Sequence, residues 1–121
     1  MKIPIAAVVG PTATGKSEIG IEIAGILGGE IVSVDSMQVY RGMDIGTAKV
    51  MPDERFTKDG KEIPHHMLDI ADPGENYSVG RYQEEAGEII KQIHQRGNLP
   101  ILVGGTGLYF NALVYEYEFA P

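Results

Sequence analysis

The sequence has no cysteine and few basic residues, and each shortage excludes a class of protein. Without cysteine there is no disulfide framework and no cysteine-bound zinc, which fits a reducing compartment. Ten Lys and Arg stand against 17 Asp and Glu, so the net charge is −7. This balance argues against a generic basic nucleic-acid binder, because such proteins neutralise phosphates with Lys and Arg. A local basic site is still compatible with this negative net charge.

Long apolar runs, repeats and low-complexity segments are also missing, and no run is long enough to span a membrane. The run "IPIAAVV" at residues 3–9 is too short for a signal-peptide core and continues into a glycine-rich loop, so it predicts a buried parallel strand. The hydrophobic share of 43% and the charged share of 22% are those of one ordinary globular domain. A cytoplasmic protein is expected.

Apolar periodicity predicts strands alternating with helices, the pattern of an open α/β sheet. The expected strands are residues 3–9, 30–34, 65–70 and 99–103. The first expected helix covers residues 17–27, and the third begins at about Leu108. The second lies between an N-cap at Ser78 and Gly97. The apolar stripe of the second helix is Val79, Tyr82, Ala86, Ile89, Ile90 and Ile93. In the first helix Ile19, Ile23, Ile26 and Leu27 share one side.

Residues 50–63 are charged and rich in turn formers, and they predict an exposed mobile loop or a hairpin that turns at Asp59-Gly60. The pair His65-His66 predicts a structural or hydrogen-bonding role, because adjacent strand residues point to opposite faces and no third metal ligand is suitably spaced. Tyr109, Tyr115 and Tyr117 are expected in the core or an interface.

The stretch "GPTATGKS" has the spacing of a phosphate-binding loop, and it follows a strand and opens a helix as such loops do. Its glycines let backbone N–H groups surround phosphate oxygens, Lys16 adds charge and Ser17 can hold Mg²⁺. Thr12 and Thr14 either contact the ligand or stabilise the loop. The predicted diphosphate-binding residues are Gly10, Pro11, Thr12, Ala13, Thr14, Gly15, Lys16 and Ser17. The motif does not reveal what the phosphates are attached to.

Asp35 follows the second strand, at the sheet edge where open α/β proteins bind ligands. Three roles are compatible with this place: a water-mediated Mg²⁺ contact, a general base, or a cap of the following turn. The strand at 99–103 ends in an uncharged "GGTG", whereas a conventional ATPase or GTPase would carry a carboxylate there. Arg41 either binds a diphosphate or tRNA phosphate or is paired structurally.

Four stretches together resemble the tRNA dimethylallyltransferases, also called the tRNA isopentenyltransferase family. They are "GPTATGKS", "SVDSMQVYRGMDIGTAK", "PHHMLDI.DP...YSV" and "PILVGGTGLY". The resemblance covers nearly the whole chain. Its departures are Thr14, where serine is frequent, and a longer stretch before Pro64. It implies a P-loop NTPase-like open parallel sheet flanked by helices.

The resemblance also implies the reaction, transfer of a dimethylallyl group from dimethylallyl diphosphate to N6 of the adenosine next to the anticodon, at position 37 of the tRNA. Asp35, Thr106 and Lys16 would be catalytic, with Asp35 accepting the N6 proton. Ser36, Met37, Gln38 and Thr106 would line the path of the base, together with Asp35. Mg²⁺ would assist through Ser17, and Arg41 would bind the donor diphosphate.

Residues 1–121 are then expected to be the P-loop core of a monomeric enzyme. A helical tRNA-binding insertion and C-terminal elements would follow residue 121, and the tRNA anticodon stem-loop would be bound mainly there. Two alternatives stay open: a P-loop small-molecule kinase that uses ATP, and a diphosphate-binding fragment that is inactive by itself.

Overall fold

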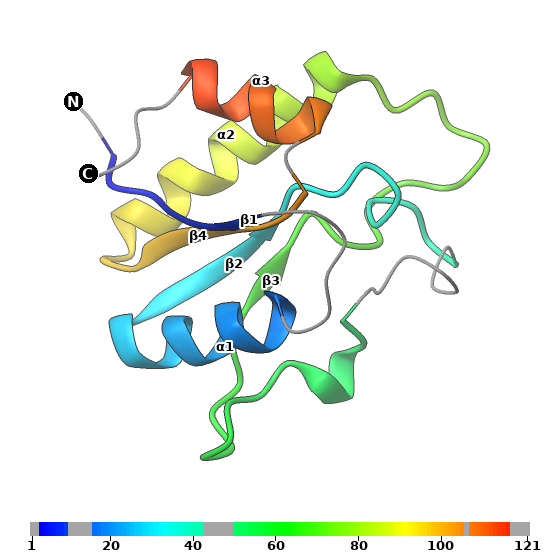
Figure 1. Cartoon of the computed structure of the whole chain (residues 1–121). Coiled ribbons are helices and arrows are strands. Elements are labelled where there is room, and N and C mark those ends of the chain that lie inside the picture. The colour runs from blue at the N-terminus through cyan, green and yellow to red at the C-terminus, as the bar shows by residue number, and fades with distance from the viewer. Residues whose placement is uncertain (1–2, 10–15, 43–49, 106, 117–121) are drawn as a thin grey trace.

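The computed structural model describes residues 3–9, 16–42, 50–105 and 107–116, for Lys16 and residues 114–116 only the backbone (Figure 1). Its strands are β1 (Ala6–Val9), β2 (Gly29–Ser33), β3 (His65–His66) and β4 (Leu99–Gly104), and its α-helices are α1 (Lys16–Leu27), α2 (Val79–Gln95) and α3 (Leu108–Glu116). All strand pairs are parallel, and the order across the sheet is β1-β4-β2-β3. The predicted open parallel α/β sheet flanked by helices is confirmed.

The helices cover both faces of the sheet, with α1 on one face and α2 and α3 on the other (Figure 1). Successive strand residues alternate between the two layers, as the strand period of two requires. Ile31 and Ile101 pack in the cluster with α1, whereas Val32 and Leu102 pack in the cluster with α2 and α3. This double coverage explains why β2 is buried along its whole length and why β4 is apolar over most of its length.

The apolar side predicted for α1 is wrong. Ile19, Ile26 and Leu27 are exposed by 54%, 81% and 56%, whereas Ile21 and Ala24 are buried. The helix turns Gly20 toward the sheet, and this glycine lets it approach closely, because a Cβ on Gly20 would come within 2.8 Å of Val103 Cγ2. Close approach of the helix axis therefore decides the buried face: of the predicted side only Ile23 packs against the core, and Ile19, Ile26 and Leu27 are left outside.

The ends of α2 agree with the sequence. The Ser78 hydroxyl accepts a hydrogen bond from the Arg81 amide at 3.1 Å, and Gly97 adopts a positive φ of 81° just after the helix. Along the predicted stripe, four residues are fully buried and two are partly buried. The buried ones are Tyr82, Ala86, Ile90 and Ile93, and the partly buried ones are Val79 and Ile89.

Residues 50–63 form a short 3-10 helix, η1 (Pro52–Glu54), followed by a hairpin. Phe56 and Glu62 make an antiparallel bridge, and Gly60 turns with a φ of 87°. The Glu22 carboxylate of α1 accepts a hydrogen bond of 2.8 Å from the Lys58 amide, which ties the hairpin to the helix. The hairpin interpretation is confirmed.

Two strands are shorter than expected. Pro4 lacks the N–H that a strand ladder needs, and β1 begins only at Ala6. After His66 the backbone turns through positive φ values of 66° at Met67 and 55° at Asp69, which ends β3. Within the described residues, no helix combines the length and the apolar character needed to cross a membrane.

Candidate functional site

The strands β1, β2 and β4 are parallel, so their carboxyl ends, which precede the segments with the predicted site residues, meet at one edge of the sheet. Val9 pairs with Gly104, and Ser33 pairs with Val103. The predicted phosphate loop, the segment after β2 and the "GGTG" segment are thus anchored to neighbouring strand ends. Gly10, Pro11, Thr12, Ala13, Thr14, Gly15 and Thr106, and the side chain of Lys16, lie outside the described residues.

Ser17 is the residue of the phosphate-binding motif whose side chain is described. It is partly buried in the first turn of α1, which begins at Lys16. The N-terminus of a helix carries partial positive charge and unpaired N–H groups, which favour a bound anion. The start of α1 at Lys16 therefore offers the partial positive charge that the motif requires.

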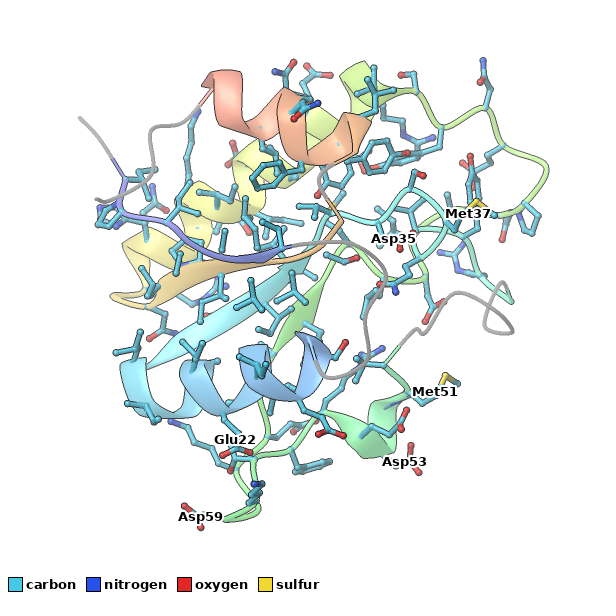
Figure 2. All side chains as sticks on the ribbon, in the orientation of Figure 1. Glu22, Asp35, Met37, Met51, Asp53 and Asp59 are labelled. Carbon is cyan, nitrogen blue, oxygen red and sulfur yellow. The ribbon has the colours of Figure 1, made fainter. Side chains whose placement is uncertain are left out.

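Asp35 lies two residues beyond β2 and opens a tight turn (Figure 2). Its Oδ1 accepts a hydrogen bond of 2.8 Å from the Met37 amide, and its carbonyl accepts one of 3.2 Å from the Gln38 amide. One carboxylate oxygen thus caps the turn, as one of the three hypotheses expected. The side chain is only partly buried, so capping does not remove it from the site edge.

The end of β4 runs directly against the backbone at Asp35. A Cβ on Gly104 would lie 2.8 Å from Val34 Cγ2 and 3.4 Å from the Asp35 nitrogen, and its φ of +149° is one that other residues rarely adopt. Glycine at this position is thus required by the packing of the two strand ends. The first glycine of "GGTG" therefore lies directly against the backbone of Val34 and Asp35.

The segment after Asp35 is clamped by a second segment that is distant in sequence. The Asp69 amide donates to the Gln38 carbonyl at 3.1 Å, and the Ile70 amide donates to the Val39 carbonyl at 2.8 Å. The Arg41 amide donates to the Ala71 carbonyl at 2.8 Å. Met67 and Asp69 are non-glycine residues at positive φ, so strained backbone supports this clamp. No sequence signal identified these two positions.

Exposure differs among the residues expected on the path of the base. Ser36 is exposed and Met37 is 44% exposed, whereas Gln38 is partly buried. Figure 2 places Met37 further out along the loop than Asp35. Gln38 is held from inside, because its Oε1 accepts a hydrogen bond of 3.0 Å from the buried Ser33 hydroxyl. An apolar side chain at the surface and a fixed amide behind it suit contact with a planar base.

Arg41 pairs with Asp72 through Nη1 and Oδ1 at 2.9 Å, and both side chains are more than half exposed. The geometry agrees with the structural-pairing alternative. Exposed ion pairs contribute little to stability, so such a pair can exchange for a phosphate at small cost.

The two histidines have the structural roles that their spacing predicted. His65 Nδ1 contacts the Ile63 carbonyl at 2.7 Å, and burial lowers the pKa of His65 to about 4. His66 Nε2 contacts Glu30 Oε1 at 2.7 Å, on the strand pair β2–β3. Within the described part of the chain, no three His, Cys, Asp or Glu residues form a group that could hold a metal.

A buried carboxylate, absent from the sequence predictions, organises the opposite end of β2. Glu30 is 3% exposed and receives Arg96 Nη2 at 2.7 Å, Arg96 Nε at 3.1 Å and Asn98 Nδ2 at 2.8 Å, besides its contact with His66. Burial by itself raises the pKa of Glu30, but the hydrogen bonds from Arg96, Asn98 and His66 outweigh it and lower the pKa to about 2. This network joins β2 and β3 to the short connection between α2 and β4 that contains Arg96 and Asn98.

Fold and site together define a class: α/β proteins in which a phosphate-binding motif connects an apolar parallel strand to a helix. Comparison with known proteins identifies the family within this class. Residues 38–121 match the family model described as IPP transferase, and residues 3–59 match the one described as isopentenyl transferase. The chain therefore belongs to the IPP transferase family.

Among curated relatives, the chain is 61% identical over 120 residues to the tRNA dimethylallyltransferase of Moorella thermoacetica, and 54% identical over 118 residues to that of Pelotomaculum thermopropionicum. These alignments cover 99% and 98% of this chain but 37% and 36% of the relatives. The chain thus spans little more than a third of the length of the relatives it matches.

Solved structures share the fold. The full-length tRNA isopentenylpyrophosphate transferase from Bacillus halodurans matches with a TM-score of 0.85 and 51% identity, over 99% of this chain and 38% of the other. A eukaryotic dimethylallyltransferase acting on tRNA matches with a TM-score of 0.81 and 38% identity, over 93% of this chain and 27% of the other.

Proposed function

We propose that this chain is the catalytic core of a tRNA dimethylallyltransferase, which transfers the dimethylallyl group of dimethylallyl diphosphate to N6 of the adenosine next to the anticodon. The observation that carries the proposal is the loop after β2. There a carboxylate, an exposed methionine and an inwardly held glutamine follow one another at the sheet edge that also receives the phosphate-binding motif. The names of the relatives give the same chemistry.

The proposed reaction exchanges one bond to carbon for another. The N6 lone pair attacks C1 of the dimethylallyl group, the C1–O bond breaks, and the diphosphate leaves with the electron pair. Asp35 accepts the proton that N6 loses. The backbone N–H groups of the loop at residues 10–15, to which Pro11 contributes none, the Lys16 ammonium and the start of α1 stabilise the charge that grows on the leaving diphosphate.

The residues at this sheet edge are suited to a Mg²⁺ ion that retains most of its water ligands. Mg²⁺ prefers oxygen ligands and binds through few protein groups together with phosphate oxygens. The Ser17 hydroxyl at the start of α1 offers an oxygen of this type. When bound, the ion supplies electrostatic stabilisation of the diphosphate. Arg41 exchanges Asp72 for a diphosphate oxygen.

On the acceptor side, Ser36, Met37, Gln38 and Thr106 line the path of the adenine, which leaves its stack to reach the donor. Met37 packs against the flat ring, and Gln38 and Thr106 offer hydrogen bonds. We place the segments that grip the anticodon stem in the part of the relatives that this chain does not cover. The enzyme acts as a cytoplasmic monomer in this proposal.

Ligand-dependent thermal unfolding of the full-length protein tests the donor assignment against the kinase alternative. Dimethylallyl diphosphate with Mg²⁺ is expected to raise Tm, because a ligand that binds only the folded state stabilises it. ATP at the same concentration is expected to raise it less. A larger shift with ATP would contradict the proposed donor. Lys16→Ala is the matched variant, and it should reduce the shift given by dimethylallyl diphosphate.

A further inference from the structure

Tyr82 of α2 is the largest fully buried side chain in the described part of the chain. Its neighbours in the apolar stripe of the helix are aliphatic, and a phenylalanine would fill almost the same space. A buried hydroxyl is costly unless it is hydrogen-bonded, so the oxygen of this tyrosine needs a partner. The hydroxyl donates to the carbonyl of Ser33, the last residue of β2.

The direction of this hydrogen bond is fixed by the chemistry of its two partners. A backbone carbonyl only accepts, so the Tyr82 hydroxyl must donate. Burial raises the pKa of Tyr82 well above its usual value, so the hydroxyl keeps its proton at neutral pH. Asp35 lies two residues after Ser33, and the Val34 amide between them donates to the Val103 carbonyl at 3.1 Å. The Tyr82 hydroxyl thus holds the backbone directly before Asp35.

The ring of Tyr82 holds a second segment. It stacks on Tyr109 with centroids 3.9 Å apart and an interplanar angle of 18°. Tyr109 is buried in the first turn of α3, three positions after Thr106 in the sequence. A second contact fastens α3 to α2, because Gln83 Nε2 donates to the Ala112 carbonyl at 2.8 Å. One buried side chain therefore contacts both the end of β2 and the start of α3.

We propose that Tyr82 is a positioning residue for the transfer step: its hydroxyl fixes the end of β2 before Asp35, its ring fixes the start of α3 after Thr106, and the side chain thereby sets the spacing of the two. This rests on the proposed function, in which both act at the acceptor base. A general base must lie within hydrogen-bond reach of the proton that it accepts, and a misplacement of about 1 Å costs about a hundredfold in rate. Tyr82 is fully buried and acts through the backbone segments that it joins.

The test compares Tyr82→Phe with the wild-type full-length enzyme. This variant keeps the ring, and with it the stack on Tyr109, and removes only the hydroxyl. Single-turnover transfer from saturating dimethylallyl diphosphate to a saturating anticodon stem-loop is expected to be about three- to tenfold slower, the usual effect of losing one neutral hydrogen bond. Donor affinity, measured by calorimetry, is expected to be unchanged, because the hydroxyl holds the end of β2 whereas the phosphate-binding motif follows β1.

Tyr77→Phe separates positioning from general loss of stability. It makes the same chemical change at a buried tyrosine whose hydroxyl donates to Glu85 of α2 at 2.7 Å rather than to a strand. Both variants are expected to lower Tm, but Tyr77→Phe is expected to keep the wild-type rate of transfer. Tyr109→Leu removes the stack, leaves the Tyr82 hydroxyl in place and is expected to slow transfer as well. If Tyr82→Phe fails to fold, Tyr109→Leu is measured in its place.

A double-mutant cycle with Asp35→Asn tests whether Tyr82 acts through the proposed general base. In the Asp35→Asn background, Tyr82→Phe is expected to slow transfer no further. Equal losses in both backgrounds, unchanged transfer in Tyr82→Phe, or an equal loss in Tyr77→Phe would overturn the proposal. Transfer by the wild-type enzyme is a separate readout: its absence would refute the proposed function, whereas its presence together with unchanged transfer in Tyr82→Phe would refute only the role of Tyr82.

Discussion

The Asp35 carboxylate has two tasks in this account, and its geometry separates them. One oxygen accepts the Met37 amide and holds the turn, which an asparagine side chain can also do. Accepting a proton from the base requires the carboxylate. A substitution that keeps the first task and removes the second is therefore available.

Asp35→Asn in the full-length enzyme is expected to bind dimethylallyl diphosphate normally and to lose about 10²–10⁴-fold in the rate of transfer, the usual contribution of a general base. Single-turnover transfer and calorimetric donor binding measure the two quantities. Near-normal transfer by this variant would leave Asp35 as a turn cap and nothing more.

Residues defined by contacts were the hardest to predict. The place of Asp35 follows from the strand before it, and the N-cap at Ser78 follows from the helix after it. Ser33 gave no signal, because its importance depends on its contact with Gln38 and on Tyr82, which is 49 positions away. The positive φ values of Met67 and Asp69 were equally invisible, since methionine rarely adopts this conformation and aspartate, although enriched in it, occurs there only in a minority of cases.

Among the elements, α1 shows why an apolar pattern can mislead. Apolar residues lie around much of this helix, so periodicity alone does not choose a buried side. Gly20 decides it, because the absence of a Cβ lets the helix approach Val103. The same glycine makes α1 pack tightly against the sheet directly after the phosphate-binding motif.

A pair of substitutions in α1 tests this correction. Ile21→Ala is expected to lower the free energy of unfolding by about 2–5 kcal/mol, the usual cost for a buried isoleucine. Ile26→Ala, with the same chemical change at an 81% exposed position, is expected to change it by about 0.5 kcal/mol or less. Urea unfolding measures both. Equal costs at the two positions would contradict the observed orientation of α1.

The Glu30 network gives the elements a pH-dependent connection. The pKa of Glu30 is lowered from its usual 4.5 to about 2, so its contribution to stability is complete above about pH 4.5 and is lost as the pH falls toward 2. His65 behaves similarly at higher pH. Its pKa is lowered from 6.5 to about 4, so its contribution is lost as the pH falls between these values.

Glu30→Gln is expected to lower the free energy of unfolding at pH 7 by about 2 kcal/mol, because charged hydrogen bonds to Arg96 are replaced by neutral ones. The difference from wild type should shrink as the pH falls below 4.5. Glu88→Gln on the exposed side of α2 is the control and should cost little. A difference that stays constant from pH 7 to pH 3 would contradict the assigned titration of Glu30.

At the scale of the whole molecule, the class of fold could be predicted from the sequence. Strand and helix positions followed from apolar runs, turn residues and caps. The buried face of α1 and the Glu30 network could not be predicted, because they depend on how distant elements meet. Glu30 and Arg96, for example, are 66 positions apart.

The most direct test of the central claim is the transfer reaction itself. The full-length enzyme is incubated with dimethylallyl diphosphate labelled in the dimethylallyl group, Mg²⁺ and an anticodon stem-loop with adenosine at the acceptor position, and label on the RNA is measured. The account predicts label on N6 of that adenosine and none in Asp35→Asn at the same time point. No label on the RNA with the wild-type enzyme, with both substrates bound, would contradict it.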